Sequence, residues 1–193
     1  MSDTFDPIML ELPEYFETER LIVRAPRPGD GAELNAAIRE SQAELKPFMP
    51  FARVLPQPED TERLVRRKRL EFLARTDLML LMTDRQSGRI VGASGLHRFD
   101  WNARRFEIGY WIRSSLAGRG LVTESVNGLT AFAAERLDAN RIEIRCDERN
   151  VRSAAVARRA GFTLEGVLRS WRREEDGTLV NEMVFAKVRG IDY

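Results

Sequence analysis

The chain has 193 residues, a length typical of one domain of ordinary size. Its 31 Lys and Arg nearly balance its 30 Asp and Glu, and the resulting formal net charge of +1 argues against a polybasic nucleic-acid-binding protein. Hydrophobic residues make up 43% of the chain, more than a disordered protein contains.

The chain has one Cys and one His, so neither an internal disulfide nor a bound metal ion is expected. The N-terminus lacks the basic start and apolar run of a signal peptide. The longest apolar run, Leu78 to Met82, is far shorter than the ~20 residues of a membrane span. We therefore expect a cytoplasmic monomer or homodimer that binds neither membranes nor nucleic acids.

The first half of the chain predicts an N-terminal arm, one strand and two helices. Residues 1–16 form the expected arm, and 17–193 the expected single domain. A strand with a β-branched centre covers 20–25, and Asp30 is placed to cap a helix that ends at Pro47. After a proline-rich loop, a second helix begins at Pro58. Its expected buried side chains are Leu64, Leu70, Phe72 and Leu73.

The second half of the chain predicts a meander of strands followed by alternating helices and strands. The expected strands are 78–83, 90–99, 106–112, 141–146, 162–172 and 179–188. The expected helices are 117–137 and 152–160. This order indicates a mixed α/β domain, with one sheet and helices packed on it.

A glycine-rich turn separates the strand 106–112 from the long helix that follows. Gly118 and Gly120 allow backbone amides to turn toward an anion, and the helix N-terminus adds the positive end of its dipole. Neither a P-loop nor the three-glycine dinucleotide motif is present. The pattern predicts a phosphate-binding turn, with a purely structural turn as the alternative.

A second motif lies downstream, where Asn150, Ser153 and the pair Gly161-Phe162 follow one another at short, defined distances. Asn150 ends the loop after a strand. It can either contact a ligand or cap the next helix.

At these residues the chain resembles the GNAT superfamily of acetyl-CoA-dependent N-acetyltransferases, in particular its RimJ/RimL-type branch. The resemblance extends from Glu19 to Val188 and is strongest in 107–124 and 150–166. It implies a strongly bent, mixed seven-stranded sheet with helices on both faces. The sheet would be splayed between its fourth and fifth strands, with acetyl-CoA in the opening.

The resemblance also implies how acetyl-CoA is held. Main-chain amides of the glycine turn would bind the pyrophosphate, and the main chain of the splayed strand would pair with the pantetheine arm. The implied cofactor-binding residues are Trp111, Ile112, Arg113, Gly118, Arg119, Gly120, Leu121, Val122, Thr123, Asn150 and Ser153. The chain departs from the superfamily pattern at Ser115, where Gln or Arg is common.

Catalytic roles implied by the resemblance are less complete. Many members use a Tyr at the position of Ala157, whereas the RimJ/RimL-type pattern has a Ser one turn earlier, here Ser153. Its hydroxyl can hydrogen-bond the departing thiolate and relay a proton, although a first-turn polar residue is the structural alternative. We expect Cys146 to be a core residue, since no partner that would activate its thiol stands beside it.

Glu107 is the first choice for the group that takes the proton of the acceptor amine. Its structural alternative is a surface Glu paired with Arg. His97, Glu174 and a water molecule are the other candidates.

The function implied is direct transfer of an acetyl group to an amine, most readily the N-terminal α-amino group of a ribosomal or other protein. A GNAT enzyme acting on a small-molecule amine, such as a polyamine, antibiotic or amino acid, has nearly the same cofactor motifs. A non-catalytic acetyl-CoA-binding sensor or assembly protein is an alternative of another class.

Overall fold

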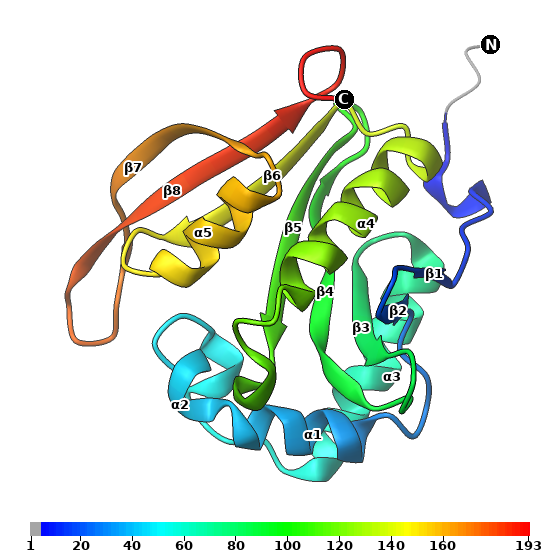
Figure 1. Ribbon diagram of the computed structural model, residues 1–193, viewed down its shortest axis with the longest axis vertical. Helices are drawn as coiled ribbons and strands as arrows, with labels where there is room; N and C mark the ends of the chain where they lie inside the picture. Colours follow the sequence, from blue (N-terminus) through cyan, green and yellow to red (C-terminus); the bar gives the residue numbers. More distant parts are fainter. Residues whose placement is uncertain (1–4) are drawn as a thin grey trace.

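One mixed sheet runs through the molecule and carries helices on both faces (Figure 1). The computed structural model describes residues 5–193, so the first four residues of the predicted arm lie outside the described residues. The elements, in chain order, are η1 (Pro7–Met9), β1 (Tyr15–Glu17), β2 (Leu21–Arg24), α1 (Gly31–Glu40), α2 (Gln42–Leu45), η2 (Pro50–Ala52), α3 (Pro58–Ala74), β3 (Leu78–Asp84), β4 (Ile90–Asp100), β5 (Arg105–Ile112), η3 (Ser114–Leu116), α4 (Leu121–Arg136), β6 (Arg141–Asp147), α5 (Val151–Arg159), β7 (Thr163–Arg173) and β8 (Leu179–Val188).

Within residues 5–193 the sheet has eight strands in the order β1-β2-β3-β4-β5-β6-β8-β7, one more than predicted. The additional strand is β1, at the end of the predicted arm, where Phe16 pairs with Val23. Three residues are too short a segment to show a strand pattern in the sequence. All neighbouring strands are antiparallel except β5 and β6, which are parallel.

The predicted splay is confirmed between β5 and β6. These strands pair only where Arg105 to Glu107 lie beside Arg141 to Glu143. Beyond Glu107 they separate, and Figure 1 shows α4 and α5 on either side of the opening. Among the residues that the structure describes, the remainder of β5 therefore has no neighbouring strand along one edge.

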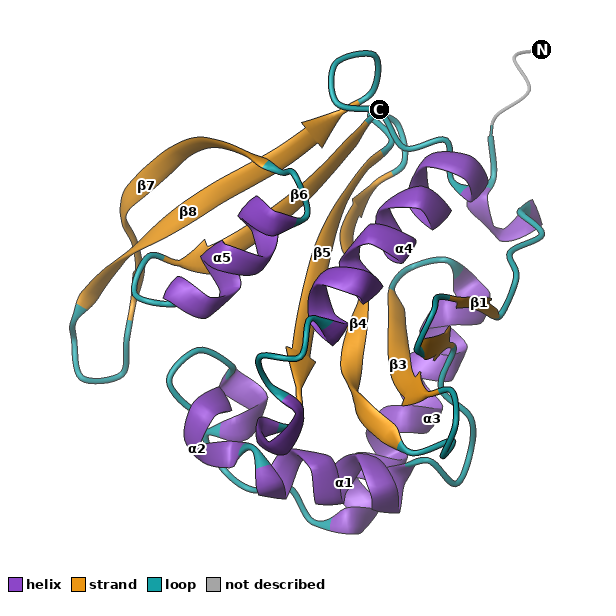
Figure 2. Cartoon of the chain, in the orientation of Figure 1, coloured by secondary structure: helices purple, strands orange, loops and turns teal. Residues whose placement is uncertain are grey.

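The two faces of β5 belong to two different hydrophobic clusters. Phe106 and Ile108 are buried in the cluster that joins the sheet to α4 and α5, and Tyr110 packs against it. Trp111 packs against the cluster formed with α1 and α3, on the opposite face (Figure 2). Because side chains alternate along a strand, even-numbered residues of β5 face α4 and odd-numbered ones face away from it.

The predicted helix over 30–47 is divided into α1 and α2 at Ser41. Asp30 was expected to cap this helix, but its side chain makes no capping bond. Its carboxylate instead accepts two hydrogen bonds from Arg24 at 2.7 and 2.8 Å and one from the amide of Arg27. The bidentate ion pair with Arg24 thus takes the place of the capping bond. The local sequence does not show which of the two Asp30 forms.

The buried face of α3 also differs from the prediction. Val65 and Phe72 are buried, whereas Leu70 and Leu73 are 66% and 46% exposed. Thr61 is buried as well, so the buried face of α3 is formed by Thr61, Val65 and Phe72.

The helices of residues 5–193 include none with the length and apolar character that crossing a membrane requires.

Candidate active site

The glycine turn adopts a backbone conformation that favours glycine at two positions. Gly118 and Gly120 have φ values of +78° and +80°. The guanidinium of Arg20 holds the turn in place, because it donates to the Arg119 carbonyl at 2.9 Å and to Glu124 of α4 at 2.7 Å. The turn is therefore held by the residue that precedes β2, 99 positions before Arg119 in the sequence.

This turn presents unused hydrogen-bond donors. The first helical bond runs from the Glu124 amide to the Gly120 carbonyl, so the amides of the preceding residues point out of the N-terminal end of α4. The hydroxyl of Thr123 is buried and finds no hydrogen-bond partner within residues 5–193. A cavity of about 740 Å³ beside the turn has both cations (Arg20, Arg89, Arg119) and carboxylates (Glu19, Asp84) in its lining. The unused amides and the Thr123 hydroxyl fit an anionic ligand such as the diphosphate of CoA.

The free edge of β5 offers fewer groups than predicted. The amide of Arg113 donates to the Val91 carbonyl at 2.8 Å, so the main-chain groups of Arg113 and Trp111 are directed toward β4. By the same alternation, the amides and carbonyls of Tyr110 and Ile112 face the opening. Of the three residues predicted to pair with the pantetheine arm, Ile112 therefore has its main chain on the correct side.

Arg113 also has its side chain engaged elsewhere. Its guanidinium is buried and donates to the Ile90 carbonyl at 2.8 Å and to Glu40 at 2.7 Å. The expected cofactor contact of Arg113 is corrected on this ground, because both its main chain and its side chain bind within the protein. Arg113 instead ties the end of β5 to β4 and α1.

Ser153 lies at the opening, paired with a tyrosine that the sequence pattern did not assign. The Tyr110 hydroxyl lies 3.0 Å from the Ser153 hydroxyl and donates to the Ser153 carbonyl at 3.0 Å. Burial raises the pKa of the Tyr110 phenol well above its usual range, and the hydrogen bond from Ser153, which lowers the pKa, has the smaller effect. Tyr110 therefore keeps its proton at neutral pH and serves as a donor.

Asn150 caps α5, since its side chain accepts a hydrogen bond from the Ser153 amide at 3.1 Å. This is the structural alternative considered for Asn150, and it also places Ser153 in the first turn of α5.

Cys146 is a buried free thiol on β6. Burial raises the pKa of this thiol, which keeps it protonated and disfavours a role as nucleophile. Residues 5–193 contain no cluster of His, Cys, Asp and Glu arranged to hold a metal ion.

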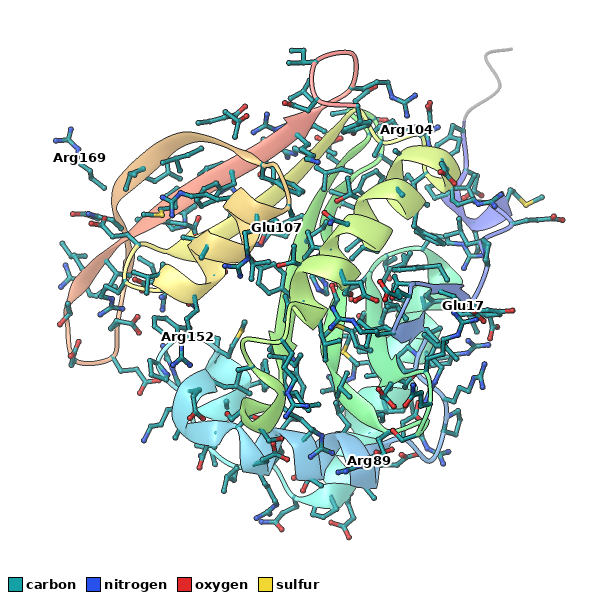
Figure 3. All side chains as sticks on the ribbon, viewed as in Figure 1. Glu17, Arg89, Arg104, Glu107, Arg152 and Arg169 are labelled. Carbon is teal, nitrogen blue, oxygen red and sulfur yellow. The ribbon has the colours of Figure 1, made fainter. Side chains whose placement is uncertain are left out.

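Glu107 stands where β5 and β6 part, and Figure 3 labels its side chain there. Its carboxylate accepts a hydrogen bond from Arg98 at 2.9 Å and lies 3.7 Å from Arg145. Burial raises the pKa of Glu107, against the opposing charges of Arg98 and Arg145. A cavity of about 330 Å³ has Glu107, Arg145 and Trp171 in its lining, on the face of the sheet away from α4.

His97 is the cross-strand partner of Glu107 on β4. Its Nδ1 lies 2.6 Å from one carboxylate oxygen of Asp77. The other carboxylate oxygen of Asp77 accepts a hydrogen bond from the ammonium of Lys68 at 3.1 Å. Burial acts to raise the pKa of Asp77, but the hydrogen bond to His97 and the charges of His97 and Lys68 outweigh it, so the pKa is lowered.

Glu174 lies far along the chain from Glu107 and His97, and its carboxylate forms ion pairs with arginines. Its carboxylate contacts Arg53 at 2.7 Å, Arg172 at 2.9 Å and Arg149 at 3.2 Å. Three guanidinium groups thus surround this one carboxylate and hold it away from a free role at the site.

The sequence pattern missed Tyr110 and Asp77 as site residues. Tyr110 lies inside the segment Glu107 to Trp111, which is part of the motif. The sequence did not show that its side chain points toward Ser153. Asp77 meets His97 only because β3 and β4 pair with Leu78 opposite Leu96, a register that the sequence does not specify.

Comparisons with known proteins agree with this architecture. A family model described as "Acetyltransferase (GNAT) domain" matches residues 20–163. The Bacillus subtilis (strain 168) protein named "Putative ribosomal N-acetyltransferase YdaF" is 32% identical over 168 residues, covering 86% of this chain and 86% of that protein. The Escherichia coli (strain K12) "Ribosomal-protein-serine acetyltransferase" is 32% identical over 80 residues, which are 42% of this chain and 45% of its own.

Two solved structures share the fold. The ribosomal L7/L12 α-N-protein acetyltransferase RimL, in complex with coenzyme A, superposes with a TM-score of 0.84 at 24% identity, covering 91% of this chain and 98% of RimL. The microcin C7 self-immunity acetyltransferase MccE, in complex with acetyl-CoA and AMP, has a TM-score of 0.81 at 24% identity, covering 88% and 93%.

Proposed function

The chain belongs to the GNAT acetyltransferase family, and from this premise we propose that it transfers the acetyl group of acetyl-CoA to the N-terminal α-amino group of a protein. The relatives named for ribosomal substrates support a ribosomal protein as the acceptor. A cytoplasmic location, expected from the sequence, belongs to the same proposal.

The observation that carries this proposal is the arrangement around the opening between β5 and β6. The glycine turn and the Ser153–Tyr110 pair lie on the α4 and α5 side, and charged side chains of β4, β5 and β6 lie on the other. In this arrangement the turn binds the phosphates, and the main chain of Ile112 is free to hold the pantetheine arm. We further include Gly118 to Thr123 and Asn150 in the cofactor site and place Ser153 beside the sulfur. Trp111 is left out, because its main chain is directed toward β4 and its side chain packs on the opposite face.

Bound acetyl-CoA supplies a thioester carbon to which an amine nitrogen can bond as the carbon–sulfur bond breaks. The hydroxyls of Ser153 and Tyr110 are 3.0 Å apart, so a proton given to the sulfur by one can be replaced through the other. Ser153 and Tyr110 thus act together in place of the tyrosine that many members have at the position of Ala157.

The opposite side carries carboxylates suited to a cationic amine. One oxygen of Glu182 is buried and forms no hydrogen bond within residues 5–193, its nearest cation being Arg145 at 3.5 Å. With Glu107 close by, this side can attract an ammonium group. An α-amino group, with an ordinary pKa near ~8, is easier to deprotonate than a lysine side chain near ~10.4.

The test is incubation of the purified chain with acetyl-CoA and peptides that copy N-termini of ribosomal proteins. We expect CoA release together with a mass increase of one acetyl group, located at the α-amino group by fragmentation. The matched control is each peptide with its N-terminus chemically blocked and an internal lysine retained, which should stay unmodified.

Other outcomes decide between the alternatives. Acetylation of small amines but of no peptide would replace the protein substrate with a small-molecule substrate. Binding of acetyl-CoA without CoA release across peptides and amines would identify a non-catalytic acetyl-CoA-binding protein and overturn the proposed reaction.

A further inference from the structure

The geometry points to His97, held by Asp77, as the group that removes the proton from the acceptor amine. This inference rests on the proposed function and deepens it. It assigns removal of the amine proton to an imidazole on β4, in place of Glu107, the first choice from the sequence.

The imidazole ring is fixed at one nitrogen and free at the other. Nδ1 lies 2.6 Å from Asp77, and the side chain is 30% exposed. Within the described chain, no hydrogen bond to Nε2 is formed. When an Asp carboxylate accepts a hydrogen bond from Nδ1–H, the neutral ring carries its free electron pair on Nε2.

Two glycines leave room for this ring across the strands. A Cβ atom on Gly109 would lie 2.9 Å from Cδ2 and 3.1 Å from Nε2 of His97, and one on Gly95 would lie 3.1 Å from Cε1. The ring therefore lies over β5 at Gly109, beyond the point where β5 and β6 part. Nε2 is thus beside the opening, on the face away from α4.

Glu107 is less suited to the same task. Its Oε2 already accepts a hydrogen bond from Arg98 at 2.9 Å and lies 3.7 Å from Arg145, so two cations balance the negative charge of this carboxylate. We assign Glu107 to holding the charge of the incoming ammonium beside the imidazole.

The charged groups around His97 come from α3, β4, β5 and the loop before β3. Asp77 precedes β3, Lys68 belongs to α3 and contacts Asp77, Glu107 is the partner on β5, and Arg98 follows on β4. The 3.1 Å contact with Lys68 ties Asp77 to α3, and Lys68 is itself held by Glu71 at 2.7 Å. Asp77 and Lys68 are therefore positioning residues.

The proton balance of the step is complete without another reactant. One N–H bond of the ammonium breaks, its proton passes to Nε2, and the electron pair stays on nitrogen for bonding to the thioester carbon. As the carbon–sulfur bond breaks, the sulfur takes a proton through Ser153 and Tyr110, and the second N–H proton of the amine replaces it. CoA leaves as a thiol, and His97 returns its proton to solvent.

The first test reads the imidazole directly and needs no activity. The chain has a single His, so nitrogen NMR of the untagged protein shows one imidazole. We expect the neutral ring to carry its proton on Nδ1, and Asp77→Asn to weaken this preference. A neutral ring protonated on Nε2 would overturn the inference, whatever the acceptor is.

The second test is kinetic. His97→Ala should lower kcat/KM by about 100-fold or more near neutral pH, and the loss should shrink as the pH rises above ~8, where the α-amine is neutral on its own. Added imidazole should restore part of the activity of His97→Ala, since the vacated space lies between two glycines. His97→Gln, which keeps the bulk of the side chain, serves if the alanine variant folds poorly.

Controls separate this inference from the proposed function. Ser153→Ala should lose activity without rescue by imidazole, and all variants should bind acetyl-CoA as the wild type does. A wild-type chain without transfer would overturn the proposed function. An active wild type whose His97→Ala variant is equally active, or is impaired alike at every pH and not rescued, would overturn the role of His97 alone.

Discussion

The two faces of β5 carry different kinds of machinery. On the α4 and α5 side, the site consists of main-chain amides, two left-handed glycines and a neutral pair of hydroxyls. On the other side it consists of ionisable side chains, with His97, Asp77 and Glu107 in contact with one another or with arginines. One face is built to hold a large anion at fixed positions, and the other to move a proton and receive a cation.

This difference predicts that variants of the two faces separate two measurable quantities. Changes to the glycine turn should act on the affinity for acetyl-CoA. Changes to the hydroxyl pair and to the His97 side should act on turnover and leave that affinity intact.

The largest effect is expected for the hydroxyl pair. Replacing Ser153 with Ala and Tyr110 with Phe together should lower kcat by about 10²–10⁴-fold, because the thiolate then leaves without a donor. The dissociation constant for acetyl-CoA, measured by calorimetry, should stay near the wild-type value. Loss of affinity equal to the loss of kcat would mean that the pair binds the cofactor and does not act on the sulfur.

Gly109→Ala should reduce turnover by up to about 10²-fold, because the added Cβ displaces the imidazole of His97 from its place over β5. Steady-state kinetics with a saturating acceptor peptide measures this loss. The nitrogen NMR signal of the imidazole should shift in the same variant. Full activity with an altered imidazole signal would contradict the role of this face in proton removal.

Gly120→Ala should weaken acetyl-CoA binding by about tenfold, since an alanine at φ +80° costs about 1–2 kcal/mol of strain that reorganisation of the turn would relieve. Gly190→Ala is the matched control, with a φ of +78° and no atom within 4 Å of the added Cβ. It should lower stability similarly while leaving affinity unchanged. Equal affinity for the two variants would remove the turn from the binding site.

The smallest effect concerns Glu107 and pH. Its pKa is raised by burial above the usual 4.5, so the stability linked to its titration is fully present below that value and is lost as the pH rises through the raised pKa. The wild type should therefore gain in unfolding free energy relative to Glu107→Gln between about pH 7 and about pH 4. Urea denaturation of both proteins at each pH checks the sign, and a relative loss at the lower pH would contradict burial as the cause.

The sequence predicted the α4 side better than the other. Two short segments carry the residues of this side, one with Gly118 and Gly120 and the other with Asn150 and Ser153. Each segment forms a local structure, the glycine turn or the start of α5, so both could be predicted from the motifs. The splay was expected from the resemblance to the GNAT superfamily, which the same motifs carry.

The other side depends on strand register and long-range ion pairs. Asp77 meets His97 through the pairing of β3 with β4, and Arg113 is drawn away from the cofactor by Glu40 of α1. Asp30 likewise pairs with Arg24 and does not cap α1. With 31 cations and 30 anions, many pairings are possible, and only the folded chain selects among them.

The most direct measurement of the division between the faces is a crystal structure with a bisubstrate ligand, in which CoA is joined through an acetyl group to the α-amino nitrogen of a peptide. The account predicts the diphosphate at the Gly118 to Thr123 turn, the sulfur within hydrogen-bond distance of Ser153 or Tyr110, and the α-amino nitrogen beside Nε2 of His97. A ligand whose CoA and peptide parts lie on the same face of β5 would contradict it.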